Sequence, residues 1–506
     1  MSGKATAALH VACARADERG VQRALDAGAD VNSLDDQHRS VLWLALLGHA
    51  EIDSAPDATT EDANRVGVLK LLLARPDINL MTLNSARIVT PLALAAWLNW
   101  PKCVNAILKE SDGAAAVDCM DAGGATPLMY AARDGSVDVA RILLAHGAHV
   151  DLCDANTRSV LQHALTSPQI MWMCELALRR QRLKILTKQT QHNPHDPHTA
   201  SQTALLTLLS NSLPAAPLTT SSTTSPTKSS TTSAAALAAQ YAPPSLSRLA
   251  PRTLASSVSQ LIAAVHVGNV PLLRSLLFPP RSGVAPVGIV NLSDGQGWSA
   301  LHWALRVDLP VACSRREIVE ALWSAGADVG LPTLDERGER LTPLHVFARY
   351  AVDEVVGSSD VDTSTAVSPL YALTSYLIHT LKFSLTAKDG HNETPLHAAA
   401  ERGFSADVLA ALLDADVRGE VRAMKNDRGL THAKSLKHTL RVCSRTQALS
   451  VPSPPHNLGR DDVAGATAPV STGPYRVSSF MSQNTSRYAR VQTARCDITA
   501  NESGAA

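Results

Sequence analysis

This sequence lacks the features by which membrane-spanning and secreted proteins are recognised. It contains no run of 18 apolar residues, and its N-terminal MSGKATAALH has no apolar stretch of the kind that forms a signal peptide. Aromatic residues make up only 4 % of the 506 residues, which argues against an aromatic-rich β core. We therefore expect a soluble, intracellular protein of the cytoplasm, the nucleus or both.

An excess of charge of one sign is also missing. The 46 basic and 46 acidic residues cancel, so no electrostatic footprint for a nucleic acid or an anionic membrane is present. The eight cysteines contain no C-x-x-C pair, and we interpret them as reduced thiols in the core or in loops rather than as metal ligands or disulfides. They are Cys13, Cys103, Cys119, Cys153, Cys174, Cys313, Cys443 and Cys496.

No catalytic motif is found. The sequence has no G-x-S-x-G, no glycine-rich phosphate loop and no H-E-x-x-H. His192, His195 and His198 form H-x-x-H-x-x-H, which could gather three imidazoles on a metal. Because prolines 194 and 197 prevent a helix there, we favour a solvated histidine-rich linker. No enzymatic activity, cofactor or metal is predicted.

A repeat is what the sequence does contain. Residues 121–150, DAGGATPLMYAARDGSVDVARILLAHGAHV, form one complete unit with a T-P-L-x-x-A core. Two intervals between successive core leucines equal 33 residues, and the others are longer because loops have been inserted. The core leucines are Leu9, Leu42, Leu92, Leu128, Leu161, Leu261, Leu301, Leu344 and Leu396.

Each part of the unit has a structural role. Thr126-Pro127 and Thr394-Pro395 place a capping hydroxyl before a proline at the first helical position, so a helix should begin there. In the run 137–144, apolar residues Val137, Ala140, Leu143 and Leu144 have helical spacing and predict a second helix. Gly28, Gly147 and Gly326 stand where a helix end commonly turns left-handed. The unit is therefore helix, turn, helix and projecting loop.

By these motifs the chain resembles the ankyrin-repeat family over residues 1–186 and 251–440, with the strongest likeness at Leu128 and Leu396. The resemblance implies an all-α solenoid in two stacks, with about five repeats in residues 1–186 and about four plus a degenerate cap in residues 251–440. A Ser/Thr/Pro/Ala-rich linker (residues 187–250) and the tail (residues 441–506) should be disordered. We expect a monomer.

Within the linker, residues 203–213 (TALLTLLSNSL) form an apolar island that is either a transient helix or a docking segment. Ser225 and Ser453 each precede a proline, as in proline-directed phosphorylation sites, although chance also explains such dipeptides in Ser-rich tracts.

Histidines inside the repeats invite a catalytic interpretation. His10, His302, His345 and His397 all follow a core leucine. The resemblance implies that this histidine is structural and bonds the backbone of the adjacent loop. The apparent pair of Asp389 and His397 then has the same architectural origin.

The repeats also depart from the family pattern. The acidic inserts 48–65 and 351–367 each interrupt a repeat between its two helices, whereas inserts after Phe278 and around 330–340 enlarge projecting loops. In the family, loops and first helices line a concave surface that binds partners. The positions that the motif places there are Trp97, Arg133 and Asp134 in the first block and Trp298, Arg306, Arg349, Tyr350, Glu393, Glu401 and Arg402 in the second.

Two of these residues have a second interpretation. Trp298 is either an interface anchor, as aromatic residues often are, or it packs against the enlarged loop containing Val287 and Ile289. Trp97 is either a partner contact or a cover for the helix surface near Trp100, and we favour the cover.

Two functions follow from the resemblance. The first is a non-enzymatic scaffold or adaptor that binds partner proteins through the concave face and loops. The alternative is a regulatory subunit of a signalling or transcription-control complex, in which another chain supplies catalysis or DNA binding.

Overall fold

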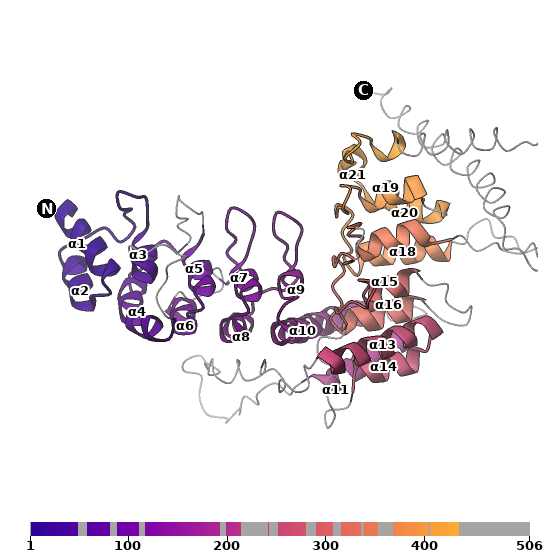
Figure 1. The fold of residues 1–506 in the computed structure, drawn as a ribbon, viewed down its shortest axis with the longest axis horizontal. Coiled ribbons are helices and arrows are strands. Elements are labelled where there is room, and N and C mark those ends of the chain that lie inside the picture. Colours follow the sequence, from indigo (N-terminus) through magenta and orange to yellow (C-terminus); the bar gives the residue numbers. More distant parts are fainter. Residues whose placement is uncertain are drawn as a thin grey trace, which may run out of the picture. The chain divides into compact units, whose positions relative to one another are not determined.

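The computed structural model consists of successive α-helices joined by turns and projecting loops (Figure 1). In the described part of the chain there is no regular β-strand, only single bridges within loops, so the predicted all-α repeat architecture is confirmed. None of the described helices is long and apolar enough to cross a membrane. The structure describes residues 2–48, 58–80, 89–110, 117–192, 199–213, 241, 251–279, 290–306, 315–334, 338–352, 368–402 and 405–434.

Each of the nine predicted leucines lies on a helix and is buried, with at most 2 % of its surface exposed. In chain order a second helix follows each of them. The nine leucine-bearing helices are α1 (Ser2–Ala14), α3 (Val41–Leu47), α5 (Pro91–Trp97), α7 (Pro127–Arg133), α9 (Val160–His163), α13 (Pro251–Val267), α15 (Ala300–Arg306), α17 (Pro343–Tyr350) and α19 (Pro395–Arg402). Their followers are α2 (Glu18–Asp26), α4 (Ala58–Leu73), α6 (Pro101–Glu110), α8 (Val137–Ala145), α10 (Pro168–His192), α14 (Val270–Leu277), α16 (Arg315–Ser324), α18 (Pro369–His379) and α20 (Ala406–Ala415).

Local sequence explains where these helices begin. Thr126 accepts a hydrogen bond from the backbone N–H of Met129, and Pro127 occupies the first helical position, as predicted. Thr342 differs, because its hydroxyl bonds Nδ1 of His345 instead of capping the backbone. On α8 the buried residues include Val139, whereas Val137, which the helical spacing had placed in the stripe, is only partly buried. Gly28, Gly147 and Gly326 all have positive φ, of 79°, 88° and 107°, as expected.

The first five repeats form two rows of helices. In one row α1, α3, α5, α7 and α9 pack side by side, and in the other α2, α4, α6, α8 and α10 do the same. Figure 1 shows the projecting loops on the side of the first row. Neighbouring loops are tied by backbone hydrogen bonds, such as the one from the Ala155 N–H to the Gly123 carbonyl at 2.8 Å. We call the surface made by the first row and these loops the loop-side face.

The segment expected to be a disordered linker begins as ordered helix. Helix α10 continues to His192, and α11 (Thr199–Ser212) packs against α10 and α16 with Leu205 and Leu209 buried. The expectation of disorder is therefore wrong for 187–192 and 199–213, because the apolar island at 203–213 finds a surface to cover. Residues 214–240 and 242–250 lie outside the described part, as do the end of the predicted second block (435–440) and the whole tail (441–506).

Chain contacts divide the molecule into two units. Unit 1 comprises residues 1–301 and 309–331, and unit 2 comprises residues 302–308 and 332–506, so the chain passes between them within α15. The predicted second block is thus shared between the units. Its first part belongs with the first block because α10 and α11 both pack on α16.

A network of buried polar groups inside unit 1 joins α10 to Asn291 and to residues 325–328. Asn291, which is 1 % exposed, donates to Oε1 of Glu175 at 2.8 Å and to the Gly326 carbonyl at 2.9 Å. It also accepts from the backbone N–H of Asp328 at 2.6 Å. Arg179 donates to the Ala325 carbonyl at 2.7 Å. A Cβ on Gly326 would come within 3.1 Å of the Glu175 backbone, so the glycine permits this close approach.

Unit 2 repeats the same packing on a smaller scale. Helix α17 packs on α19 and α18 on α20, and α21 (Glu420–Ala423) follows. Its loops also touch, since the Gly390 N–H donates to the Glu339 carbonyl at 2.8 Å. A Cβ on Gly390 would lie 2.1 Å from the Gly338 carbonyl oxygen, so this contact requires glycine.

Several predictions fall partly or wholly outside the described residues. The acidic insert 351–367 does separate α17 from α18, but residues 353–367 are not described. The end of insert 48–65 forms the first turns of α4, and residues 49–57 are not described. Cys313, Cys443 and Cys496, both Ser-Pro sites and the side chains of the three linker histidines also lie outside. The five described cysteines are free thiols, buried except for Cys153.

Candidate partner-binding surface

Three of the side chains on the loop-side face stack on one another across two repeats. Trp97 ends α5, and Tyr130 and Arg133 lie one turn apart on α7. Trp97 and Arg133 both stand five positions after their core leucines, so the repeat brings them to equivalent places on neighbouring helices. Residues three apart on a helix are neighbours on its surface, and Tyr130 and Arg133 have this spacing. We call these three side chains the aromatic shelf; Tyr130 is itself buried, with 8 % of its surface exposed, whereas Trp97 is partly buried and Arg133 is exposed.

The shelf is a layered arrangement of flat groups. The rings of Trp97 and Tyr130 stack with centroids 5.5 Å apart and an interplanar angle of 26°. The Arg133 guanidinium carbon lies 5.2 Å from the Trp97 ring centroid and 4.9 Å from that of Tyr130. A cation within about 6 Å of an aromatic face is attracted by the electrons of the ring. The aromatic faces therefore form a place that suits a flat cation.

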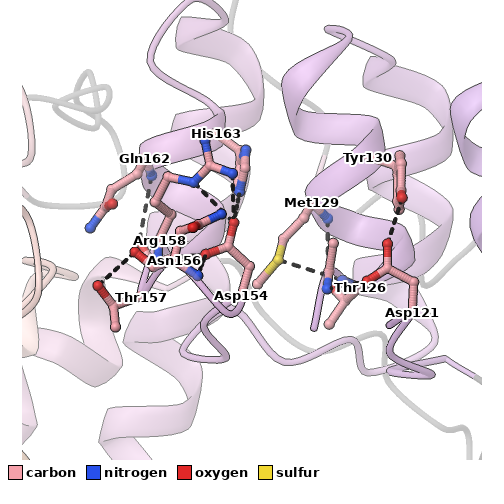
Figure 2. Close-up of polar contacts among 12 residues, drawn as sticks. Asp121, Thr126, Met129, Tyr130, Asp154, Asn156, Thr157, Arg158, Gln162 and His163 are labelled. Carbon is pink, nitrogen blue, oxygen red and sulfur yellow. Dashed lines mark hydrogen bonds and ion pairs between the residues drawn. The ribbon is translucent and has the colours of Figure 1, made fainter. Parts of the chain in front are cut away.

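Two carboxylates border the shelf. Asp134 accepts from Nε and Nη2 of Arg133 at 3.0 and 3.2 Å, and this hydrogen bonding raises the pKa of Arg133. Asp121 accepts from the Tyr130 hydroxyl at 2.6 Å (Figure 2). Burial and the hydrogen bond to Asp121 raise the pKa of Tyr130 above its usual value, so the phenol stays protonated. Asp121 also accepts from the Ala125 N–H at 2.8 Å, which fixes it in the loop.

The next repeat continues the face with an aspartate at the same place in its loop. Asp154 accepts from the backbone N–H groups of Asn156 and Arg158, both at 2.9 Å, and from His163 Nε2 at 3.2 Å (Figure 2). Burial acts to raise the pKa of Asp154, but the hydrogen bonds and charge of Arg158 prevail and lower it. Burial, together with the charge of Arg158, lowers the pKa of His163, so the imidazole is neutral at pH 7. This aspartate holds the turn of the loop through these hydrogen bonds.

Unit 2 carries a related cluster. The Arg306 guanidinium carbon lies 5.3 Å from the Trp303 ring centroid and 5.0 Å from that of Tyr350. Trp303 and Arg306 stand two and five positions after Leu301, as Tyr130 and Arg133 do after Leu128. Arg306 and Tyr350 are both partly exposed. Each unit thus presents an arginine over two aromatic rings.

Three predicted site residues do not face outward, contrary to what the motif implied. Trp298 is 8 % exposed, which favours packing over an interface role, while Val287 and Ile289, the expected packing partners, lie outside the described residues. Arg349 is 5 % exposed, and its Nη1 donates to Glu339 at 2.7 Å, because the loop of its own repeat folds over it. Glu393 is 3 % exposed and accepts from Asn426 Nδ2 at 3.2 Å, because the loop of the following repeat covers it.

The remaining predicted residues vary in exposure. Trp97 is partly buried, and Arg133 and Asp134 are exposed. Glu401 is partly buried and accepts from Arg428 at 2.9 Å. Arg402 ends α19, and its side chain lies outside the described part. Tyr130, Asp121 and Trp303 were not predicted. An aromatic residue three positions before an arginine in a predicted helix was the signal that could have identified Tyr130 and Trp303.

The histidines that follow core leucines hold loops in place. Nε2 of His302 bonds the Leu341 carbonyl at 3.0 Å, that of His345 bonds the Glu393 carbonyl at 2.8 Å, and that of His397 bonds the Leu430 carbonyl at 3.1 Å. His10 instead bonds the Ser33 hydroxyl at 3.0 Å. Among the described residues, no group of three or more His, Cys, Asp or Glu side chains is placed to hold a metal ion. The structural role expected of the three unit 2 histidines is visible in these contacts.

Comparison with known proteins agrees with the repeat pattern. Residues 60–169 match the family model of ankyrin repeats in three copies, a range that contains the aromatic shelf. The chain is also 34 % identical over 167 residues to the nuclear factor NF-kappa-B p105 subunit of Gallus gallus, a match covering 28 % of this chain and 17 % of that protein. The chain thus spans about a sixth of the length of this relative. The predicted resemblance is confirmed: the chain contains ankyrin repeats.

Proposed function

We propose that this ankyrin-repeat chain is a non-enzymatic scaffold or adaptor that binds partner proteins through the loop-side face of unit 1. Ankyrin repeats are protein-protein interaction modules, which supports a role in binding. The observation that carries the proposal is the aromatic shelf, where Trp97 and Tyr130 support an exposed arginine. Trp, Tyr and Arg are the residues most enriched at the energetic centres of interfaces.

Two further observations support a role without catalysis. Both ring nitrogens of His345 and of His397, which would attract a catalytic interpretation, are engaged by a loop carbonyl and a threonine hydroxyl. The second arginine cluster, at Trp303, Arg306 and Tyr350, gives unit 2 a surface of the same type. A chain with two such surfaces is suited to hold one partner at each, as a scaffold does.

The balanced charge favours protein partners over nucleic acid, and we propose an intracellular monomer.

The test compares two tryptophan variants of the full chain in pull-down with mass spectrometry. Trp97→Ala removes one of the two rings of the shelf, and Trp172→Ala removes an indole that is also partly buried but lies on α10. We expect partners retained by the wild type to be lost from Trp97→Ala and kept by Trp172→Ala, with both variants folded by circular dichroism. Equal recovery with both variants would refute the assignment of the face.

The alternative function is a regulatory subunit of a signalling or transcription-control complex. The 34 % identity to a subunit of a nuclear factor favours it, although the match covers 17 % of that protein. The same pull-down separates the two functions. Recovery of transcription factors or signalling enzymes as stoichiometric partners supports the alternative, and recovery of unrelated proteins at both units supports the scaffold.

A further inference from the structure

We propose that the aromatic shelf recognises an arginine side chain of the partner protein, and that Arg133 occupies the place of that side chain until the partner binds. This inference rests on the proposed function and names the chemistry of the ligand. It depends on three observations: the geometry of the shelf, the weak hold on Arg133, and the local charge.

The geometry selects a flat cation. Arg133 lies over both rings of the shelf, at 5.2 and 4.9 Å from their centroids. A guanidinium is planar, stacks on aromatic faces and is more weakly hydrated than an ammonium. An arginine arriving from a partner can therefore make the contacts that Arg133 now makes.

Arg133 is held only loosely in this place. Its side chain is 45 % exposed, and its ion-pair partner is Asp134, the next residue, whose side chain is 32 % exposed. Exposed ion pairs add little to stability, because solvent screens them and ordering two side chains costs entropy. Leaving the rings costs Arg133 two cation–π contacts, which an incoming guanidinium replaces, so Arg133 can swing into solvent without disturbing the repeat. Asp134 would then pair with the incoming guanidinium.

Local charge favours a basic ligand over an acidic one. Residues 117–166 contain six aspartates, three arginines and no lysine or glutamate, a net charge of −3 with histidines neutral. Asp121 borders the shelf through the Tyr130 hydroxyl, and no lysine or arginine in the described part pairs with it. An acidic ligand would be repelled by Asp121 and Asp134. The guanidinium donors of Arg133 that could bind it already donate to Asp134. Complementary charge of this kind suppresses the wrong partners.

A pair of charge-matched variants tests the inference. Arg133→Gln removes the guanidinium of Arg133 from the shelf, and Arg141→Gln removes the same charge from α8, where Arg141 pairs with Asp138. The probes are fluorescent peptides of Arg-Gly repeats and Glu-Gly repeats, titrated against the full chain and followed by anisotropy. We expect the Arg-Gly peptide to bind. Its affinity for Arg133→Gln should be about threefold higher than for Arg141→Gln, since the peptide no longer competes with a side chain on the rings. Trp97→Leu should weaken it by about fivefold.

Several results would overturn the inference. If Arg133→Gln weakens binding of the Arg-Gly peptide, or if the peptide binds Arg133→Gln and Arg141→Gln equally tightly, then Arg133 does not occupy the place of a partner's arginine. If the Glu-Gly peptide binds more tightly and Arg133→Gln abolishes its binding, Arg133 itself is the recognition group for an acidic partner. If neither peptide binds, the ligand class is wrong. In each case the Trp97→Ala pull-down still decides independently whether the face binds a partner, so the two failures are distinguishable.

Discussion

The amide of Asn291 donates to the carboxylate of Glu175 at 2.8 Å, although 116 positions separate the two residues in the chain. This hydrogen bond joins the loop before α15 to the long helix α10. It also explains why the start of the second repeat block belongs to the same unit as the first block. Burial raises the pKa of Glu175 to about 7, while the charge of Arg179 acts to lower it.

Replacing Asn291 should weaken this connection. Asn291→Ala removes three buried hydrogen bonds and leaves the Glu175 carboxylate, the Gly326 carbonyl and the Asp328 N–H without these partners, at a cost of about 1 kcal/mol or more each. We expect a loss of at least about 3 kcal/mol in urea unfolding. Gln296→Ala, in the exposed part of the same loop, should change stability by less than about 0.5 kcal/mol. Equal effects of the two changes would contradict the network.

Limited proteolysis should give a nicked molecule rather than two free stacks. The Ser/Thr-rich composition of residues 214–240 predicts the first cut there. The fragments should nevertheless co-elute in gel filtration, because α10 and α11 pack on α16 from across the cut. Asn291→Ala should promote their separation. Immediate separation of wild-type fragments would mean that this packing does not hold them together.

The buried leucines of the repeat offer a direct test of packing. Leu128→Ala and Leu396→Ala each remove a side chain that is at most 1 % exposed, and should destabilise the protein by about 2–5 kcal/mol. Leu34→Ala, at a site that is 44 % exposed, should cost less than about 1 kcal/mol. Calorimetry of the three variants measures the difference. A loss below about 1 kcal/mol at Leu128 would show that its repeat is not packed in this way.

Trp298 should contribute to stability rather than to binding. It is 8 % exposed, and its backbone N–H donates to Asp294 at 2.9 Å, so the residue is held within the loop. Trp298→Ala should cost about 3 kcal/mol, as for other buried tryptophans, and leave partner affinity unchanged. Differential scanning fluorimetry measures the melting temperature, and the pull-down measures partner binding. Lost affinity with an unchanged melting temperature would restore the interface interpretation.

Acid should destabilise unit 2. Burial lowers the pKa of His345 from 6.5 to about 4, and burial also lowers the pKa values of His397 and His432. Between pH 6.5 and 4 the unfolded chain therefore binds protons that the folded chain excludes, so stability falls as the pH falls, by roughly 3 kcal/mol for His345. Glu393, whose pKa is raised by burial and by Glu401, acts in the opposite direction and offsets part of this loss.

Urea unfolding at pH 7, 5.5 and 4.5 measures this dependence. His345→Asn cannot be protonated in this range, so the variant should be less stable at pH 7 but lose less on acidification than the wild type. A wild-type slope that the substitution leaves unchanged would mean that His345 does not titrate as described.

Part of the candidate site followed from the sequence. The repeat register places Trp97, Arg133 and Asp134 on the loop-side face, because position within a helix decides which way a side chain points. The same register misplaced Arg349 and Glu393. Loops folded over both residues, and no local pattern specifies the path of those loops. The role of the predicted residues in binding a partner remains a prediction. The predicted domain ranges also remain predictions.

The sequence by itself determined the helix pairs, because their signals are local. Threonine and proline start the helices, apolar spacing defines their buried faces, and glycines such as Gly147 end them. Tertiary structure alone decided where the repeats join. Leu205, in the segment expected to be a linker, lies on α11 and is buried where that helix packs on α10 and α16. Asn291 donates a hydrogen bond to Glu175, 116 positions away in the chain. Such contacts depend on the shape and polarity of distant surfaces, which neighbouring residues in the sequence do not encode.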